Sequence, residues 1–167
     1  YRQRYLDYGE NWWPGDFIED QEAEGIISRT MAVGGQALHW AATSPRYSQE
    51  DFRIRSLYGV GWDWPLSYEE LEPYYCEAER RIGVAGSQGP EREGWDPRSE
   101  PYPMKAFPLD YNQRQLRDWA SKADIEFWVT PTARNTQPYD GRMQCMRCGT
   151  CNICPTGAKY SPDFSLK

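Results

Sequence analysis

Four of the five cysteines in the chain are gathered in one short run, Cys145, Cys148, Cys151 and Cys154, with two residues between each pair. Disulfide scaffolds spread their cysteines along the whole chain, whereas a close and regular spacing is typical of a metal centre. The fifth cysteine, Cys76, lies alone. The run therefore predicts that this part of the chain folds around a metal.

The spacing favours an iron–sulfur cluster over zinc. Zinc sites usually join two Cys-x-x-Cys units through a loop of about a dozen residues or more, and here only Gly149 and Thr150 separate the inner pair. The bacterial ferredoxin run ends in Cys-Pro, as Cys154-Pro155 does here. We expect a three- or four-iron cluster, with zinc, paired disulfides and a vestigial cluster as alternatives. Cys76 reads as a buried thiol on a helix rather than as a remote ligand.

The composition describes an acidic, aromatic chain that should pack. Aromatic residues make up 15% of the 167 residues, which is unlike a disordered chain. A net charge of −6 argues against nucleic acid as a partner, because phosphate backbones are bound by clustered Lys and Arg. No apolar run reaches the roughly 18 residues of a membrane-spanning helix. Because the chain opens at Tyr1 without Met and ends abruptly at Lys167, we expect an internal fragment.

Local patterns predict an α+β class, mostly helix and irregular loop with a few strands. Ser67 and Glu70 form a capping box, and Gly83 is placed to end the helix that follows. Because Pro73 disrupts a helix interior, we expect a turn at 68–71 and a helix from about 73 to 82. The other expected elements are an extended run at 26–33, a short helix or turn at 36–42, a helix at 112–123 and a strand at 125–130. The side chains expected to face inwards are Tyr75, Ala78 and Ile82 on the first helix and Leu116, Trp119, Ala120 and Ala123 on the second.

A glycine pair, Gly34-Gly35, follows the extended run. Adjoining glycines let backbone N–H groups approach a pyrophosphate or a flavin, although the same pair is common in plain turns. His39 is the sole histidine of the chain. Beside Leu38 and Trp40 it reads as a core residue, yet imidazole can also act as a base or nucleophile near neutral pH. No Gly-x-Gly-x-x-Gly pattern is present, so a dinucleotide-binding βαβ unit is not expected within this chain.

Together these patterns resemble the glucose–methanol–choline oxidoreductases. The stretches that carry the resemblance are Arg29–Trp40, Ser44–Arg46 with Asp51-Phe52, Gly61–Tyr75 followed by Ala78-Glu79 and Ile82–Gly86, and Cys151–Tyr160. The most specific is Gly61–Tyr75, and the match covers roughly residues 26 to 167. Within the family the chain is most similar to the bacterial glucose, fructose and gluconate dehydrogenase large subunits, although the cluster cysteines of that branch have longer gaps.

The resemblance implies a fold in which an FAD domain adjoins a substrate domain with an antiparallel sheet. The glycine fingerprint and the catalytic residues are expected outside residues 1–167. This chain would supply a flavin-site segment at 26–42, a lid loop and helix at 43–84, a helix and strand at 112–130, and a cysteine-cluster loop at 143–160. The implied flavin contacts are Arg29, Val33, Gly34, Gly35, His39, Trp40 and Ala41. Gly-Gly-x-x-x-His-Trp is also similar to pyranose oxidase, so His39 is a hypothetical covalent attachment point for FAD.

The resemblance also implies a function. It is that of an FAD-dependent dehydrogenase, which oxidises a CH–OH group of a sugar or alcohol and passes electrons through an iron–sulfur cluster to a cytochrome or quinone. A cytochrome c subunit and a small chaperone-like subunit are the implied partners. The implied location is periplasmic or membrane-associated, with a cytoplasmic one as the alternative. Other readings are an alcohol oxidase that uses oxygen and has structural cysteines, and a non-enzymatic iron–sulfur or zinc electron-transfer module. The aromatic stretch at 62–75 argues against such small modules.

Overall fold

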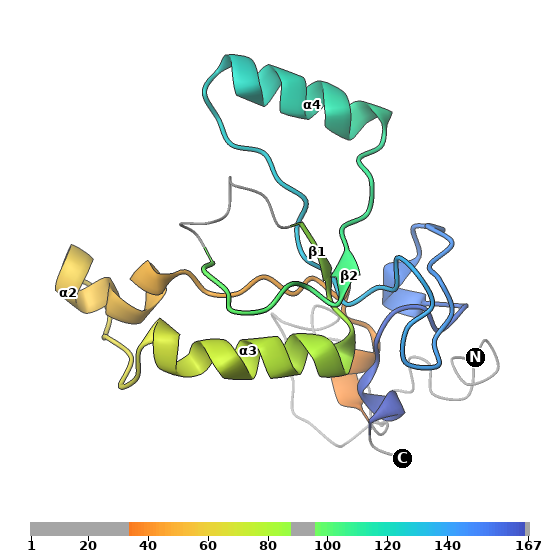
Figure 1. Cartoon of the computed structure of the whole chain (residues 1–167), viewed down its shortest axis with the longest axis horizontal. Helices are drawn as coiled ribbons and strands as arrows, with labels where there is room; N and C mark the ends of the chain where they lie inside the picture. Colours follow the sequence, from red (N-terminus) through yellow and green to blue (C-terminus); the bar gives the residue numbers. More distant parts are fainter. Residues whose placement is uncertain (1–33, 88–95, 166–167) are drawn as a thin grey trace, which may run out of the picture.

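The computed structural model of the chain describes residues 34–87 and 96–165. The expected extended run at 26–33, and with it Arg29 and Val33, lies outside the described residues. The elements, in chain order, are η2 (Gly35–Leu38), η3 (Gln49–Arg53), α2 (Ile54–Tyr58), α3 (Tyr68–Ile82), β1 (Ala85–Gly86), β2 (Met104–Lys105), α4 (Tyr111–Lys122), η5 (Cys151–Ile153) and η6 (Pro162–Phe164). Figure 1 shows α3 along one side of the short strands, with α4 standing off on the other side. Among the described helices, none is both long enough and apolar enough to cross a membrane.

Helix α3 is continuous from Tyr68 to Ile82 although Pro73 lies inside it. Both halves of the predicted capping box are present, because the Ser67 side chain accepts from the Glu70 N–H and the Glu70 carboxylate accepts from the Ser67 N–H. The predicted C-terminal cap is also confirmed, with Gly83 in the left-handed conformation at φ 71°. The expected interruption at Pro73 is wrong. Arg46 hydrogen-bonds to Tyr68 before Pro73 and to Glu79 after it, so contacts on both halves of the helix offset the hydrogen bond that proline cannot make.

The buried face of α3 is polar, which the sequence did not suggest. Tyr68, Cys76 and Glu79 are buried, whereas Ala78, expected to face inwards, is exposed. The cause is Arg46, a buried guanidinium that lies against this face and hydrogen-bonds to all three buried side chains. A buried charge needs such partners, so the face of α3 is set by a residue outside the helix.

The centre of the fold is a small set of strand pairings. β1 and β2 pair in parallel, with Ala85 opposite Met104, and Thr132 bridges antiparallel to both Ala85 and Thr43. The buried hydrophobic cluster around these pairings consists of Ala42, Val84, Tyr102 and Ala133. The expected strand at 125–130 is wrong: pairing begins only at Thr132, because 125–130 forms the arm that returns from α4 and has no strand beside it (Figure 1).

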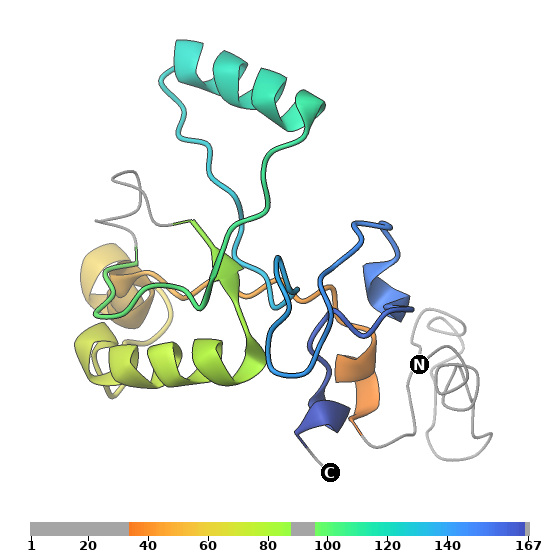
Figure 2. The ribbon, with the colours of Figure 1, turned by 45° about the vertical axis from the view of Figure 1, so that its right-hand side comes forward.

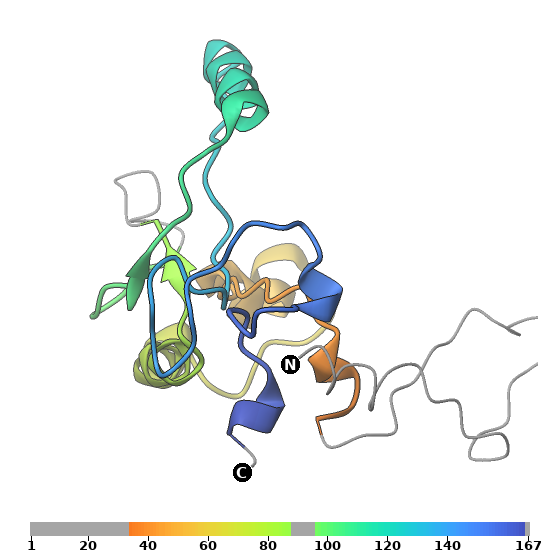
Figure 3. The same ribbon diagram turned by 90° about the vertical axis from the view of Figure 1, so that its right-hand side faces the viewer.

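Helix α4 begins at an Asp110 cap that bonds to Gln113 and lies within one residue of the predicted range 112–123. Its expected inward side chains are not buried, with Leu116 50% and Trp119 60% exposed. Figure 2 and Figure 3 show the reason, since the helix sits at the end of two extended arms, away from α3 and the strands. The amphipathic pattern therefore predicted the helix, while its apolar side has no cover within the described part of the chain.

Candidate functional site

The glycine-pair segment and the cysteine loop lie against each other although they are more than a hundred residues apart in sequence. The Lys159 Nζ donates to the carbonyl oxygens of Leu38 at 2.9 Å and Trp40 at 2.8 Å. The Trp40 Nε1–H donates to the Tyr160 carbonyl at 3.0 Å, and the two rings meet edge to face. η2 and η6 are neighbours in this junction (Figure 3). The structure thus joins two segments that the sequence marked separately as candidate site residues.

His39 lies at the junction of these segments. Its Nδ1 is 3.3 Å from the carbonyl oxygen of Asn152, which belongs to η5 in the cysteine loop. Because a carbonyl only accepts, Nδ1 is the donor in this contact. The candidate flavin attachment residue is therefore held beside the cysteine run with Nδ1 facing the loop.

The glycine pair lies in a turn at the start of η2. Gly34 and Gly35 have φ values of 102° and 54°. A Cβ on Gly34 would lie 2.9 Å from the side chain of Leu38, whereas a Cβ on Gly35 would meet nothing within 4 Å. The backbone at Gly35 is thus open to a ligand, with Trp40 half-buried further along the segment. Gly35 and Trp40 are therefore the groups of this segment that could contact a bound flavin.

Ala41 is exposed at the end of this segment. Arg29 and Val33, the remaining expected flavin contacts, lie outside the described residues. Of the seven expected contacts, the structure therefore places Gly34, Gly35, His39, Trp40 and Ala41 on one continuous stretch.

Lys159 was not identified from the sequence as a site residue. Its side chain is 1% exposed, and burial lowers its pKa, a shift that the nearby Cys154 and Cys151 oppose. The two carbonyls that it binds flank His39 in the chain. The Lys159 ammonium group therefore hydrogen-bonds to the backbone on both sides of the histidine. The sequence pointed to Lys159 only in that it lies within Cys151–Tyr160, one of the stretches that carry the family resemblance.

Hydrogen-bonding groups approach all four sulfurs of the cysteine run. The contacts are Arg147 N–H to Cys145 at 3.4 Å, Thr150 Oγ1 with Cys148 at 3.1 Å, Arg134 Nη1 to Cys151 at 3.2 Å, and Lys159 N–H to Cys154 at 3.5 Å. The contact with Thr150 lowers the pKa of Cys148. Burial raises the pKa of Cys154, but hydrogen bonds, led by the Lys159 N–H, outweigh it and the pKa is lowered. These surroundings favour thiolate character at Cys148 and Cys154.

The sulfurs of the run nevertheless do not form a metal site in this conformation. Cys154 is buried and Cys148 is exposed, and all the cysteines are free thiols. Within residues 34–87 and 96–165, no three His, Cys, Asp or Glu side chains gather closely enough to hold a metal ion. The residues as placed do not fit an iron–sulfur cluster or a zinc ion. Cys76 has the buried-thiol role, since its sulfur accepts from Arg46 at 3.2 Å and lies 2.9 Å from a Glu72 carboxylate oxygen.

Comparisons with known proteins identify the relatives of the chain. No family model matches it. It is 48% identical over 141 residues to the fructose dehydrogenase large subunit of Gluconobacter japonicus, a match that covers 83% of this chain and 25% of that protein. The chain belongs to the glucose–methanol–choline oxidoreductases. A second member, 2-methyl-1,2-propanediol dehydrogenase of Mycolicibacterium austroafricanum, is 35% identical over 153 residues, which are 86% of this chain and 27% of the relative.

The family relatives include an oxidase as well as dehydrogenases. The 6'''-hydroxyparomomycin C oxidase of Streptomyces lividus is 34% identical over 146 residues, which are 81% of this chain and 25% of the oxidase. The chain thus spans about a quarter of the length of the curated relatives that it matches.

Proposed function

We propose that the protein containing this chain is an FAD-dependent oxidoreductase that oxidises a CH–OH group of a sugar or alcohol. The observation that carries the proposal is the junction at His39, where the open backbone of Gly35, the imidazole and the cysteine loop meet. The relatives support the same class, because their names describe dehydrogenases and an oxidase. We further propose that the chain occupies the middle of the family's two-domain fold, next to the flavin.

The residues of this chain would bind and orient the cofactor rather than remove the substrate proton. FAD, when bound, supplies the acceptor for the hydride that leaves the substrate carbon. Gly35 would offer its open backbone, and Trp40 would contribute an aromatic wall. Lys159 would hold His39 in place through the two flanking carbonyls. The base that takes the hydroxyl proton is expected elsewhere in the longer protein.

Flavin reduction by substrate tests the proposal directly. The full-length protein is purified, its visible spectrum is recorded, and sugars and simple alcohols are added under anaerobic conditions. The proposal predicts a bound flavin whose absorbance is bleached by at least one of these CH–OH compounds. A protein that carries no flavin after purification and gains none when incubated with FAD would refute it.

Covalent attachment through His39 is a separate step of the proposal. Nδ1 is engaged with the Asn152 carbonyl, so Nε2 is the expected bonding atom. Protein precipitated with acid should keep its yellow colour, and the His39→Ala variant should release its flavin under the same treatment. If the wild-type pellet is colourless, the flavin is held without a covalent bond.

The electron acceptor divides two versions of the proposal. A dehydrogenase would pass electrons to a cytochrome or quinone, and an iron–sulfur cluster on the cysteine run is the relay that the spacing suggests. The run would have to rearrange to bind one, because its sulfurs are not gathered in this conformation. The 48% identity to a dehydrogenase favours this first version, and the oxidase relative, at 34% identity, represents the second, in which oxygen is the acceptor and the cysteines are structural.

Metal and peroxide measurements separate the two versions. Iron and acid-labile sulfide are determined on anaerobically purified full-length protein, together with an electron paramagnetic resonance spectrum. Iron with sulfide and slow peroxide formation would support the dehydrogenase with a relay. Protein without iron that forms peroxide rapidly during turnover would support the oxidase.

A further inference from the structure

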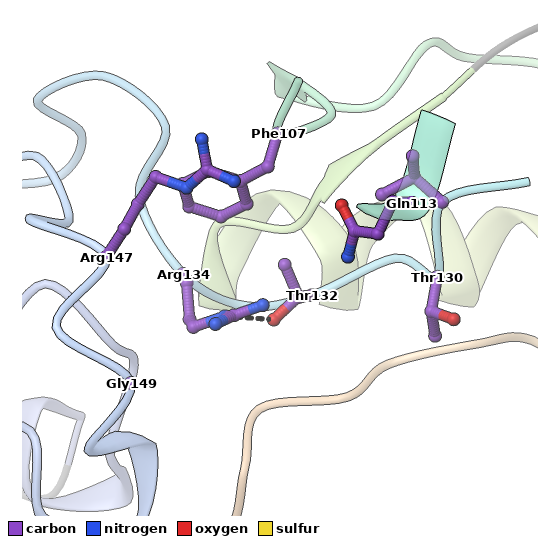
Figure 4. A pocket seen from close by; sticks show the side chains of 8 residues that line it. Phe107, Gln113, Thr130, Thr132, Arg134, Arg147 and Gly149 are labelled. Atoms are coloured by element: carbon purple, nitrogen blue, oxygen red, sulfur yellow. Dashed lines mark hydrogen bonds between the residues drawn. The ribbon is translucent and has the colours of Figure 1, made fainter. Parts of the chain in front are cut away.

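A cavity of about 220 Å³ lies between the arms of α4 and the cysteine loop. Figure 4 shows its side chains converging from three parts of the chain. The residues that line it are Phe107, Gln113, Val129, Thr130, Thr132, Arg134, Arg147 and Gly149. It is separate from the His39 junction and plays no part in the proposed flavin chemistry. Its size is below the roughly 300–1,000 Å³ of sites for drug-sized molecules, so it suits a small ligand.

Two guanidinium groups flank the aromatic wall of this cavity. The Arg134 and Arg147 guanidinium carbons lie 5.1 Å and 5.8 Å from the centroid of the Phe107 ring (Figure 4). The Arg147 guanidinium donates one hydrogen bond, from Nη2 to the Pro108 carbonyl oxygen at 3.2 Å. Contact with an aromatic face holds a guanidinium in place while its N–H edge stays available.

Arg134 is fixed by contacts that leave part of its donor edge unused. Its Nε donates to Thr132 Oγ1 at 2.9 Å and its Nη1 to Cys151 Sγ at 3.2 Å. In the part of the chain that the structure describes, neither Arg134 nor Arg147 forms an ion pair with a carboxylate. In a chain of net charge −6, two arginines on one cavity without an acidic partner are a local excess of positive charge.

The other polar groups of the cavity are suited to the same kind of ligand. The Gln113 Oε1 already accepts from the Asp110 N–H at 3.0 Å, which leaves the amide NH₂ as a donor. Thr130 is exposed and adds a hydroxyl group. Donors from two guanidinium groups, an amide and a hydroxyl match an oxygen-rich anion, since planar guanidinium groups bind carboxylate and phosphate through paired hydrogen bonds.

We propose that this cavity is a binding site for a small free oxyanion, a phosphate or carboxylate group, held between Arg134 and Arg147. The ligand would connect α4 and its arms with the cysteine loop, because Gln113 belongs to α4, Thr130 to the arm that follows it, and Arg147 to the run of cysteines. Arg134 also touches Cys151, so an occupied site would restrict the conformation of that loop.

Binding of inorganic phosphate and of acetate to the full-length holoenzyme tests the site. Each anion is titrated by isothermal calorimetry at constant ionic strength in chloride, so that general screening is the same throughout. We expect a single saturable site for at least one of the two anions. Saturation by phosphate alone would assign a phosphate site, and saturation by acetate a carboxylate site.

Matched variants locate the binding in the cavity. Arg147→Gln removes one guanidinium and should weaken the bound anion by about tenfold or more, which corresponds to the loss of a charge-assisted pair. Arg114→Gln is the control, because Arg114 is also exposed and donates to one main-chain carbonyl, that of Leu109 at 2.7 Å, but does not line the cavity. It should bind within about twofold of wild type. Thr130→Val gives a second variant at an exposed position and should weaken the anion to a smaller extent.

Three results would overturn the site. They are the absence of saturable binding for both anions, wild-type affinity in Arg147→Gln, and an equal loss of affinity in the Arg114→Gln control. The absence of saturable binding would mean that the two arginines instead pair with an acidic side chain of the longer protein. Flavin content and anaerobic flavin reduction, measured on the same samples, should be unchanged in every variant, so failure of the anion site is distinguishable from failure of the proposed function.

Discussion

The Arg46 guanidinium and the Glu79 carboxylate form a bidentate pair, with Nε–Oε1 and Nη2–Oε2 distances of 2.8 Å and 2.9 Å. Both side chains are almost fully buried, at 1% and 7% exposed. Arg98 binds the same carboxylate at 3.0 Å, and its guanidinium lies over the Tyr102 ring. This pair therefore joins α3 to the segment before η3 and to the loop that leads to β2.

The Arg46 guanidinium should stay charged throughout the range in which the protein is folded. Burial lowers the pKa of Arg46, but the hydrogen bonds to Glu79 and Tyr68 outweigh burial and raise it above its ordinary value. A buried guanidinium that cannot lose its proton needs its carboxylate, and the carboxylate needs the guanidinium. Among the residues that the structure describes, removing Arg46 leaves the buried Glu79 carboxylate with Arg98 alone, and removing Glu79 leaves the buried Arg46 guanidinium with Glu72 alone.

Arg46→Ala is accordingly expected to lower the free energy of unfolding of the full-length protein by about 3–5 kcal/mol. The exposed pair between Arg81 and Glu77 provides the comparison, because Arg81→Ala removes an i, i+4 contact worth about 0.5 kcal/mol. Denaturant unfolding followed by fluorescence measures both. Equal losses in the two variants would show that the buried pair contributes no more than a surface one.

Glu72 should make stability depend on pH in the acidic range. Burial raises its pKa, but hydrogen bonds led by those from Cys76 and Ser99 lower it from the usual 4.5 to about 2. Because the folded-state pKa is depressed, the stabilisation is present above pH 4.5 and is lost as the pH falls towards about 2.

Glu72→Gln is therefore expected to destabilise the protein by about 2 kcal/mol near pH 6, and the deficit should shrink as the pH falls through this range. Denaturant midpoints at a series of pH values, with the exposed Glu126→Gln as the matched control, give the comparison. A deficit that is the same at pH 6 and at pH 3 would mean that the charge of Glu72 is not what stabilises the fold.

The local signals in the sequence predicted helices well and burial poorly. The capping box at Ser67 and the glycine at 83 marked the ends of α3 because caps depend on residues a few positions apart. The side chains that α3 buries could not be read in this way, since Arg46 decides them and lies outside the helix. Its partners are polar, so a search for an apolar stripe selected Ala78 instead.

At the candidate site, too, the sequence marked the local segments but not the contacts that join them. The cysteine spacing and the glycine pair drew attention to two segments, and both lie at the junction described above. What joins them is Lys159, whose hydrogen bonds reach back to Leu38 and Trp40, and such long-range contacts leave no periodic pattern in the sequence. Spacing also could not decide how the sulfurs are arranged, because backbone turns such as that at Arg147, with φ 56°, determine where each thiol points.

Gly83 and Gly59 provide a test of close packing at a helix end. Both have a left-handed conformation, with φ 71° and 72°, so alanine should cost about 1–2 kcal/mol at either position through backbone strain. A Cβ at Gly83 would also lie 2.5 Å from the Arg142 guanidinium, whereas a Cβ at Gly59 meets nothing within 4 Å. Gly83→Ala should therefore be the more destabilising by about 1–3 kcal/mol in denaturant unfolding. Equal losses would show that Arg142 moves aside without cost.

Lys159 should control how firmly the flavin is held. In Lys159→Met the carbonyls of Leu38 and Trp40 lose their buried donor, and the backbone on both sides of His39 is released. Leaving buried acceptors unpaired costs about 1–3 kcal/mol, so we expect lower stability and about a tenfold weaker hold on FAD.

Lys122→Met is the matched control, since Lys122 is exposed in the last turn of α4 and its loss removes the same charge. The measurements are the flavin-to-protein ratio after purification and the dissociation constant for FAD added to flavin-depleted protein. Should flavin prove covalently bound, the rate of attachment during reconstitution replaces the dissociation constant. Only the buried Lys159 reaches the two flanking carbonyls. If Lys159→Met nevertheless retains and incorporates flavin as well as Lys122→Met does, the hydrogen bonds of Lys159 do not position His39 for the flavin.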